Sequence, residues 1–586
     1  MGKVRPALGD ALQHHRSGRL VEAERIYRDI LKYEPAHADA LHLLGVLLYH
    51  NHRAGDAVNY LESAVRRAAS TSVYHYSLGD AYRIVGRLDD AISSYRRSLE
   101  LNPSTPEAYD HLGATLTQAE RFGEAIAAFE KALELRPDFP EALNNLAFAL
   151  LRNKEPERAE DACRRALESR PEFADAHNNL GVSLLKQKRL EEAESSFDKA
   201  VQFRPDYAEA HRNLGRVLRE LDRLEDAISH FETAIALDGS QGLSYACLGD
   251  ALEFVGRPED AAACCQRGLE RDKACAELHF VYSQIALASG DFERGWAEYE
   301  WRLEMWKSSP KLRRDGSRIP AWDGSPLNGR RILLYCEQGL GDNIQFVRYA
   351  PLVARTGGEV IIECMPRLVP LFRAADLGKV FAENTELPDC DVALPITSLP
   401  HAFRTSRDSI PACVPYLKPD PKLAAAWRER IPTGAKVRIG VVWGGNPTFA
   451  ADRRRSLRLD QFAPVAAIPG LALFSLQRGE HAAQLSGAPF PIRNLEEESN
   501  DIADTAAIIS NLDLLITADT MPAHLAGALG APVWTLLHSS PDWRWMRGDE
   551  RTPWYPSMRL FRQQRPGDWA SVIRTIAEEL RHVYHL

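Results

Sequence analysis

Small and apolar residues recur along the first half of the chain with a fixed period of 34 residues. A leucine followed by a small residue sets the register, and the small residues are Gly45, Gly79, Gly113, Ala147, Gly181, Gly215 and Gly249. Sixteen residues after each small residue lies a mostly large or apolar side chain, at Leu61, Tyr95, Phe129, Cys163, Phe197, Phe231 and Cys265. Extending the register to both ends gives about nine units over residues 1–306, of which the last two are degenerate.

This pattern predicts two antiparallel helices per unit, in which a small residue on one helix lets a large residue of the other approach closely. A proline often follows the second helix, where the missing backbone N–H ends the helical hydrogen bonding. Stacked units of this kind form an α-solenoid with an extended concave surface. The register is that of the tetratricopeptide repeat, and the first half is identified as an array of such repeats.

An asparagine precedes the register leucine in three successive units, at Asn145, Asn179 and Asn213. We expect this position to lie on the first helix and to face the groove. Since each amide offers donors and an acceptor, a ladder of amides can clamp the backbone of an extended acceptor peptide whatever its sequence. The alternative is that asparagine is simply common at this repeat position and solvates the groove. The sequence leaves both interpretations open.

The period of 34 stops after the repeats, and residues 307–328, rich in serine, proline, glycine and charge, are predicted to form a linker. Short apolar runs separated by helical stretches follow, which predicts parallel β-strands buried on both faces. A gap around one predicted helix near Trp427 divides the strands into two Rossmann-like halves, residues 329–420 and 421–586. Two such halves make up the glycosyltransferase B (GT-B) architecture. The predicted strands are 331–336, 359–364, 391–396, 437–443, 471–476, 512–517 and 532–537.

The first candidate segment, EQGLGDNIQF, follows the strand 331–336. Gly339 and Gly341 allow a tight turn into a helix, and ligands of parallel sheets bind beyond the carboxyl ends of the strands. Asp342 at the start of this helix fits two roles. It is either an N-terminal cap or a general base that takes the proton of an acceptor hydroxyl. From the residue alone, capping is favoured.

The second segment, WGGNPTFAADRRRSL, follows the strand 437–443. Gly444 and Asn446, which lie on either side of Gly445, are assigned to the donor side of the site. The three consecutive arginines, with Arg453 and Arg455 as the chosen candidates, suit a phosphate leaving group because the guanidinium fork makes bidentate contacts. The alternative is a solvated basic loop.

The third segment, ITADTMPAHLAGALG, follows the strand 512–517 and is the most specific of the three. Asp519 ends the strand, and Thr520 is predicted to cap a helix that has a proline in its first turn. The N–H groups at this helix start can bind an anion. Met521 and His524 lie in the first turn, where His524 can reach a phosphate or a sugar.

These segments resemble the ADP-heptose:lipopolysaccharide heptosyltransferases of glycosyltransferase family 9. That family carries a GD after the first strand, matched by Gly341-Asp342, and a later motif D-[ST]-G-x-x-H-L-A-x-A-L-G. The later motif is matched from Asp519 to Gly530, with Met521 in place of the family glycine. The resemblance implies that Asp342 is the catalytic base, that Thr520 to His524 bind the donor phosphates, and that an arginine of the 453–455 cluster is their cationic partner. The whole layout is closer to bacterial glycosyltransferases fused to tetratricopeptide repeats, such as the FlmG-type enzymes that modify flagellin, and is similar to that of O-GlcNAc transferase.

The composition and charge of the chain argue against some partners and locations. The 586 residues carry a net charge of −9, which argues against a nucleic-acid partner. The chain starts without the apolar core of a signal peptide, and it has no apolar run long enough to span a bilayer. Its nine cysteines are scattered, as is typical of a protein in a reducing compartment. We therefore expect a cytoplasmic protein without membrane insertion. Asp389-Cys390-Asp391 spells the DxD of metal-dependent transferases, but its place before a predicted strand indicates a surface turn, and no metal is expected.

The sequence and the resemblance together predict an inverting, metal-independent glycosyltransferase. It would move a sugar from a nucleotide donor to a serine or threonine of a protein, with flagellin as a candidate, that the repeats select. Two alternatives stay open: a repeat scaffold without enzymatic activity, whose second half is degenerate, and a transferase acting on lipopolysaccharide or another glycan. The sequence leaves the nucleotide and the sugar of the donor undetermined.

Overall fold

The computed structural model describes residues 4–308, 310–448, 452–499 and 501–585. The chain forms two compact units, Met1–Asp238 and Gly239–Leu586. The boundary between them falls inside the repeat array. The last two repeats therefore belong to the same compact unit as the α/β region.

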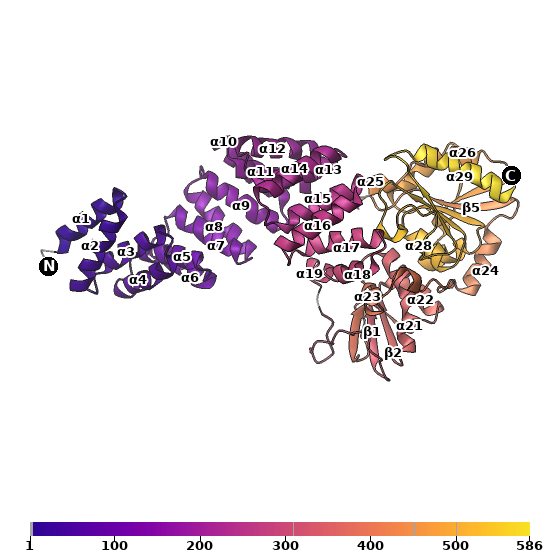
Figure 1. Ribbon diagram of the computed structural model, residues 1–586, viewed down its shortest axis with the longest axis horizontal. Helices are drawn as coiled ribbons and strands as arrows, with labels where there is room; N and C mark the ends of the chain where they lie inside the picture. Colours follow the sequence, from indigo (N-terminus) through magenta and orange to yellow (C-terminus); the bar gives the residue numbers. More distant parts are fainter. Residues whose placement is uncertain (1–3, 309, 449–451, 500, 586) are drawn as a thin grey trace. The chain divides into compact units, whose positions relative to one another are not determined.

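The first unit consists of paired antiparallel helices (Figure 1). From α3 onward, the first helix of each pair begins exactly 34 residues after the previous one, as the register predicts. The helices are α1 (Val4–Arg16), α2 (Leu20–Tyr33), α3 (Ala38–His50), α4 (Ala54–Arg67), α5 (Ser72–Ile84), α6 (Leu88–Leu101), α7 (Pro106–Gln118), α8 (Phe122–Leu135), α9 (Pro140–Arg152), α10 (Pro156–Ser169), α11 (Ala174–Lys186), α12 (Leu190–Phe203), α13 (Ala208–Glu220) and α14 (Leu224–Leu237).

The small residue of each register is small because the partner helix lies against it. A methyl group added at Gly113 would lie 2.7 Å from the ring of Phe129, which is fully buried in the second helix of the same pair. The one register position in this unit that carries alanine, Ala147, is paired with Cys163 instead of an aromatic or leucine side chain. Both residues of this pair are fully buried.

Replacing Gly113 by alanine is therefore expected to destabilise the array by about 1–3 kcal/mol, since the Phe129 ring would have to shift within a packed interior. Gly123 in α8 is a matched control, because a methyl group there meets no atom within 4 Å. The Gly123→Ala variant should be unchanged or slightly more stable, because alanine has the higher helix propensity. Chemical unfolding followed by helical circular dichroism compares the two, and equal effects would contradict this packing account.

The second unit begins with the last helices of the array and continues into the α/β region. The helices of this part of the array are α15 (Gly242–Phe254), α16 (Pro258–Arg271), α17 (Ala276–Ala288), α18 (Phe292–Tyr299) and α19 (Arg302–Met305). With them, the pairs from α1/α2 to α17/α18 correspond to the nine predicted repeats. In the part of the chain that the structure describes, no helix is both long and apolar enough to cross a bilayer.

The α/β region contains two parallel sheets. The first has the order β3-β2-β1-β4, and the second has the order β10-β9-β8-β5-β6-β7. The seven predicted strands are present, and β3, β7 and β10 were not predicted. The strands are β1 (Arg331–Tyr335), β2 (Glu359–Cys364), β3 (Lys379–Ala382), β4 (Val392–Pro395), β5 (Val437–Val442), β6 (Leu471–Ser475), β7 (Arg493–Asn494), β8 (Leu514–Ala518), β9 (Val533–Leu537) and β10 (Met558–Arg562).

Helices between the strands complete the layers around these sheets. The longer ones are α20 (Leu340–Phe346), α24 (Pro421–Arg430) around Trp427, α27 (Ile502–Ile509), α28 (Met521–Ala528) and α29 (Trp569–Tyr584). Short helices fill the remaining connections: α21 (Ala350–Arg355), α22 (Val369–Ala374), α23 (Leu399–Ala402), α25 (Asp452–Arg455) and α26 (Ala463–Ala466). The helix predicted to start at Asp342 begins two residues earlier, as α20.

The segment predicted as a linker lies along the first sheet. Trp322 is 3% exposed, and its backbone N–H donates to the carbonyl of Ala393 in β4, at 3.0 Å. The N–H of Ala393 in turn donates to the carbonyl of Pro320, at 2.9 Å. A parallel bridge between Ala321 and Ala393 completes the contact. This part of the segment therefore extends the sheet at its β4 edge.

Candidate functional site

The two most specific sequence motifs meet in the structure, although about 180 residues separate them. Helix α20, which follows β1 of the first sheet, packs against α28, which follows β8 of the second sheet. A methyl group at Gly341 would lie 2.8 Å from the His524 ring. Gly341 is therefore small because His524 lies against it, and the starts of both helices share one region at the carboxyl ends of β1 and β8.

Asp342 contributes a carboxylate with two partners. The N-cap residue of α20 is Gly339, and Asp342 lies in the first turn of the helix, so the predicted N-cap position of Asp342 is wrong. One carboxylate oxygen of Asp342 accepts the backbone N–H of Gly339 at 3.0 Å and so closes the helix start from within. The other oxygen forms an ion pair with Arg544, which comes from the second half. Burial raises the pKa of Asp342 above its usual value, and Arg544 partly offsets this rise. A carboxylate with a raised pKa is better suited to accept a proton near neutral pH than an ordinary surface aspartate.

Arg544 is the main residue of this site that the sequence did not suggest. Its side chain is 8% exposed. Besides Asp342 it contacts Asp542, at 2.8 and 2.9 Å, and the amide oxygen of Gln345 at 2.7 Å. Asp542 and Arg544 lie after β9, where Asp542 caps a short 3-10 helix over Trp543–Trp545 that is too short to leave a hydrophobic periodicity. The two tryptophans on either side of Arg544, in the letters WRW, are buried, and this apolar pair is the sequence signal that could have marked the stretch as internal.

His524 is buried and uncharged. Burial lowers the pKa of His524 well below its usual value, and the neighbouring arginines Arg544 and Arg348 lower it further. Its Nδ1 atom lies 2.9 Å from the hydroxyl of Tyr555. The ring is thereby fixed between Gly341 and Tyr555, and it can donate or accept a hydrogen bond but does not supply a positive charge.

The start of α28 has the predicted boundaries, with one difference in its cap. Thr520 occupies the N-cap position, but its hydroxyl donates back to the carbonyl of Ala518 at 3.2 Å. The helix N–H groups therefore have no side-chain cap from Thr520. Met521, which replaces the glycine of the resemblance, is half-buried and packs against the main apolar core.

Asp519 lies beside this helix start, and burial together with nearby Asp542 raises its pKa to about 6. A folded-state pKa above the ordinary value of about 3.9 means that ionisation of Asp519 opposes folding. The protonated side chain of Asp519 therefore contributes favourably to the free energy of unfolding. This contribution is present below pH 4 and is lost as the pH rises through 6. The stability advantage of Asp519→Asn over the wild type should therefore grow between pH 4 and pH 6 and then level off. Urea unfolding of both proteins across this range measures it, and a difference independent of pH would contradict the assignment.

Arg455, the last of the three arginines after β5, contacts this helix start. It donates to the carbonyl of Asp519 at 3.1 Å and to Asp452 at 3.3 Å. Arg454 stacks on the ring of Phe254 in α15, with 4.1 Å between the guanidinium carbon and the ring centre, and Arg453 is exposed. The three side chains thus have different surroundings, although they are adjacent in the sequence.

The glycine turn after β5 is held by Gln477, another residue that the sequence did not indicate. The side chain of Gln477 accepts the N–H of Gly444 at 2.8 Å and donates to the Gly444 carbonyl at 3.0 Å. Gly444 itself lies against the His481 ring. Asn446 is exposed and accepts the N–H of Thr448 at 3.1 Å, and the residues just beyond, 449–451, lie outside the described part of the chain.

The three asparagines of the repeats bridge consecutive units. The amide nitrogen of Asn179 donates to Asn144 at 2.8 Å, and that of Asn213 donates to Asn178 at 2.9 Å. Asn145 donates in the same way to Asp110, at 3.0 Å. These amides therefore connect neighbouring first helices, which is a role that neither interpretation of the sequence included. Peptide binding by the same amides stays a prediction.

The DxD triplet lies away from the other candidates. Asp389 and Asp391 are exposed at the amino end of β4, and Asp391 accepts the backbone N–H of Arg331 at 2.7 Å. Within the described residues, no group of three or more histidine, cysteine, aspartate or glutamate side chains is arranged to hold a metal ion.

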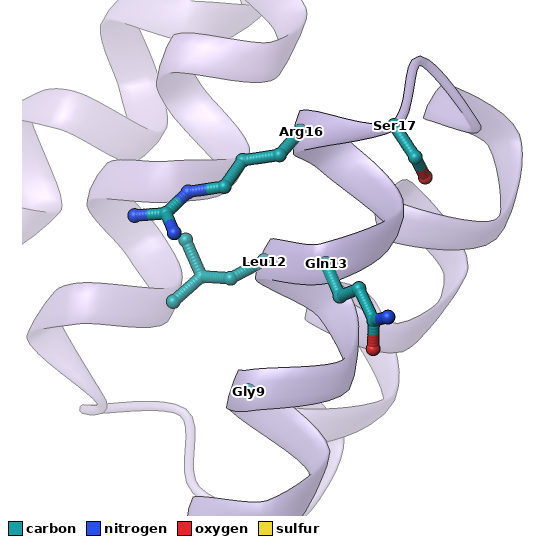
Figure 2. A pocket seen from close by; sticks show the side chains of 5 residues that line it. All are labelled: Gly9, Leu12, Gln13, Arg16 and Ser17. Atoms are coloured by element: carbon teal, nitrogen blue, oxygen red, sulfur yellow. The ribbon is translucent and has the colours of Figure 1, made fainter.

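Two surface hollows lie elsewhere. One, of about 500 Å³, is formed by α1 and the following Ser17, where Leu12 and Arg16 extend to one side and Gln13 to the other (Figure 2). The other, of about 440 Å³, lies beside the ion pair between Arg407 and Asp549. Neither includes any candidate site residue.

Comparisons with known proteins agree with the repeat architecture. Tetratricopeptide repeat models match residues 14–80, 70–138, 116–181, 172–240 and 248–300. Protein FlbA of Caulobacter vibrioides is 29% identical over 336 residues, and the match covers 52% of this chain and 55% of FlbA. The chain thus spans about half the length of that relative.

Solved structures with similar folds include three repeat proteins. The Cut9–Hcn1 hetero-tetramer of the APC/C matches with a TM-score of 0.37 at 16% identity, over 48% of this chain and 55% of that one. PilF of Pseudomonas aeruginosa matches with a TM-score of 0.31 at 26% identity, over 35% of this chain and 93% of that one. YrrB, described as a repeat protein with an unusual peptide-binding site, matches with a TM-score of 0.27 at 24% identity, over 31% of this chain and 95% of that one. The first 300 or so residues of the chain are a solenoid of tetratricopeptide repeats, and an α/β region with two parallel sheets follows them.

Proposed function

We propose that the protein is a glycosyltransferase that moves a sugar from a nucleotide-sugar donor to a serine or threonine of a protein held by its repeats. Flagellin is the acceptor that the resemblance to FlmG-type enzymes suggests. The observation that supports the proposal most is the meeting of the two motif helices. Gly341 lies against His524, and Asp342 pairs with Arg544, so residues from the carboxyl ends of both sheets form one cluster.

The proposed reaction is a single displacement at the anomeric carbon of the sugar. The acceptor hydroxyl oxygen forms the new bond to this carbon while the bond from the carbon to the phosphate oxygen of the nucleotide breaks. The hydroxyl proton passes to Asp342, and the bonding electrons leave with the nucleotide phosphate. Attack on the face opposite the leaving group inverts the configuration of the sugar.

The leaving phosphate is assigned to the start of α28 and to Arg455. The first N–H groups of a helix attract anions, and here no cap from the Thr520 side chain competes for them. Arg455 adds a fixed positive charge beside Asp519, whereas buried His524 supplies a hydrogen bond without charge. Stabilisation of the developing phosphate charge by such preorganised groups is a major source of catalysis.

Binding of a protein by the repeats is the less specific part of the proposal. Stacked helix pairs present an extended concave surface, which suits an extended chain segment. One similar repeat protein, YrrB, is described as having a peptide-binding site. The bridging asparagines keep neighbouring first helices in fixed positions and so preserve the shape of that surface.

The donor side is tested by nucleotide binding. Arg455→Ala should weaken binding of the donor nucleotide by about tenfold to a hundredfold, the value of a charge-assisted hydrogen bond. Arg453→Ala is the matched control, since Arg453 lies on the same short helix but its side chain is exposed. Calorimetry with UDP, GDP, ADP and CMP measures both variants. Equal losses would contradict the role of Arg455, and no binding of any of the four by the wild type would contradict the donor site.

A scaffold without enzymatic activity is the second candidate. The contacts of Asp342 favour it, because both carboxylate oxygens already have partners within the protein. A scaffold would hold its protein partner and transfer no sugar. The two functions are separated by supplying a captured acceptor with each of the nucleotide sugars and measuring its intact mass.

A further inference from the structure

The last residues of the repeat array reach into the carboxyl edge of the first sheet. Arg302, in α19, is 0% exposed. Its guanidinium donates to Glu337, which follows β1, at 2.8 Å, and to Thr397 and Ser398, which follow β4, at 2.8 and 2.7 Å. It also pairs with Glu300 at 2.8 Å. One arginine of the array therefore joins the ends of two adjacent strands.

The segment after β1 is held at a second point by the same repeat. The hydroxyl of Tyr299, at the end of α18, donates to Gln338 at 3.0 Å, and the amide of Gln338 lies 2.9 Å from that hydroxyl. Gln338 has a φ of 63°, in the left-handed region that a residue with a side chain adopts only when its surroundings impose it. The contacts with Arg302 and Tyr299 supply such surroundings.

This segment leads directly to the candidate base. Residues 337–342 run from Glu337 through Gln338 into the turn that starts α20, and the N–H of Gly339 is bonded to Asp342. The position of the Asp342 carboxylate therefore depends on how the preceding residues are held. Misplacement of a reacting group by about 1 Å can reduce a rate by about a hundredfold.

We propose that Arg302 and Tyr299 of the final repeat are positioning residues, which hold residues 337–342 so that Asp342 faces the acceptor hydroxyl. This inference rests on the proposed function. It means that the repeat array does more than bind a partner, because its end forms the wall of the site at the carboxyl edge of the first sheet. The fork of an arginine is required, since several acceptors in different directions are bonded at once and a lysine has a single nitrogen to offer.

The test compares Arg302→Lys with Arg547→Lys in the full-length chain. Arg547 is a matched control, because it also joins the last repeats to the α/β region, through Glu253 and Ser289, but makes no contact with residues 337–342 that the structure shows. Amide hydrogen exchange should become faster in residues 337–343 for Arg302→Lys and stay at the wild-type rate there for Arg547→Lys. The kcat for sugar transfer should fall by about tenfold to a hundredfold for Arg302→Lys, with the KM for the nucleotide sugar unchanged.

Tyr299→Phe keeps the buried ring and removes only the bond to Gln338. It tests the positioning role if Arg302→Lys does not fold. It should speed exchange over the same residues and lower kcat by a smaller factor. The positioning role is overturned if the variants exchange the amide hydrogens of residues 337–343 at the wild-type rate and also keep the wild-type kcat. That result would leave the proposed function intact. If the wild type transfers no sugar, the proposed function fails, and the exchange rates alone then decide whether the final repeat holds this segment.

Discussion

Replacing Asp342 by asparagine is expected to lower sugar transfer by at least about a hundredfold, because an amide cannot take up the proton of the acceptor hydroxyl. The protein should still fold. The asparagine oxygen can accept the N–H of Gly339, and Arg544 keeps its bonds to Asp542 and Gln345. The variant removes one acceptor from Arg544, but it also removes a buried charge whose raised pKa shows that its ionisation opposes folding, so the two effects on the free energy of unfolding act in opposite directions. Nucleotide affinity and acceptor capture should stay at wild-type values.

Asp542→Asn is the matched control for this variant. It also removes one carboxylate from Arg544, and it leaves Asp342 in place. Initial rates of transfer, measured with equal amounts of folded protein, compare the two. If Asp542→Asn loses as much activity as Asp342→Asn, the transfer rate depends on the ion pairs of Arg544, and Asp342 has no separate role as a base. If Asp342→Asn transfers at the wild-type rate, Asp342 acts as a cap and the base lies elsewhere.

Residues 329–586, expressed alone, are expected not to fold, whereas residues 239–586 should form a stable unit. The last repeat contributes buried aromatic residues to the main core of the α/β region. Trp296, 2% exposed, packs edge to face on Trp543 with 5.2 Å between ring centres, and its indole N–H donates to the carbonyl of Thr405 at 3.0 Å. Phe292 and Tyr299 belong to the same core.

The expected size of this effect follows from the area involved. An aromatic side chain buries about 150–250 Å². At about 25 cal/mol/Å², loss of three such residues removes on the order of 10 kcal/mol, which matches the whole stability of a typical domain. Near-ultraviolet circular dichroism and the cooperativity of thermal unfolding distinguish the two fragments. A fixed near-ultraviolet spectrum and a cooperative transition for residues 329–586 would contradict the assignment of the last repeat to this core.

The repeat fold could be predicted because its cause is local and repeated. Each register glycine lies against the side chain sixteen positions later, so the same packing contact recurs many times along the sequence. The strands that were missed lack such a signal. The strand β7 has two residues, and the edge strand β10 contains Arg559 and Arg562 among its five residues. Polar residues interrupt the apolar run that identifies a buried strand.

The candidate site could be predicted only in part. Segments such as those around Asp342 and His524 are recognisable because a glycine turn and a helix start leave a local pattern. Their neighbours Arg544 and Gln477 act across contacts between distant parts of the chain, and nothing in their own stretches of sequence indicates the partner. The same holds for Arg302, which looks like an ordinary charged residue at the end of a repeat but is fully buried.

We propose above all that this chain attaches a sugar to a protein. The most direct measurement compares the intact masses of proteins from cells that carry the wild-type gene with those from cells that carry Asp342→Asn at the same expression level. The account predicts at least one protein that is lighter in the variant cells by the mass of one or more sugar residues. It also predicts that the purified wild-type chain restores the missing mass when a nucleotide sugar is added. If no protein differs in mass between the two strains, although both chains are folded and present in equal amounts, the protein does not act as a protein glycosyltransferase through Asp342.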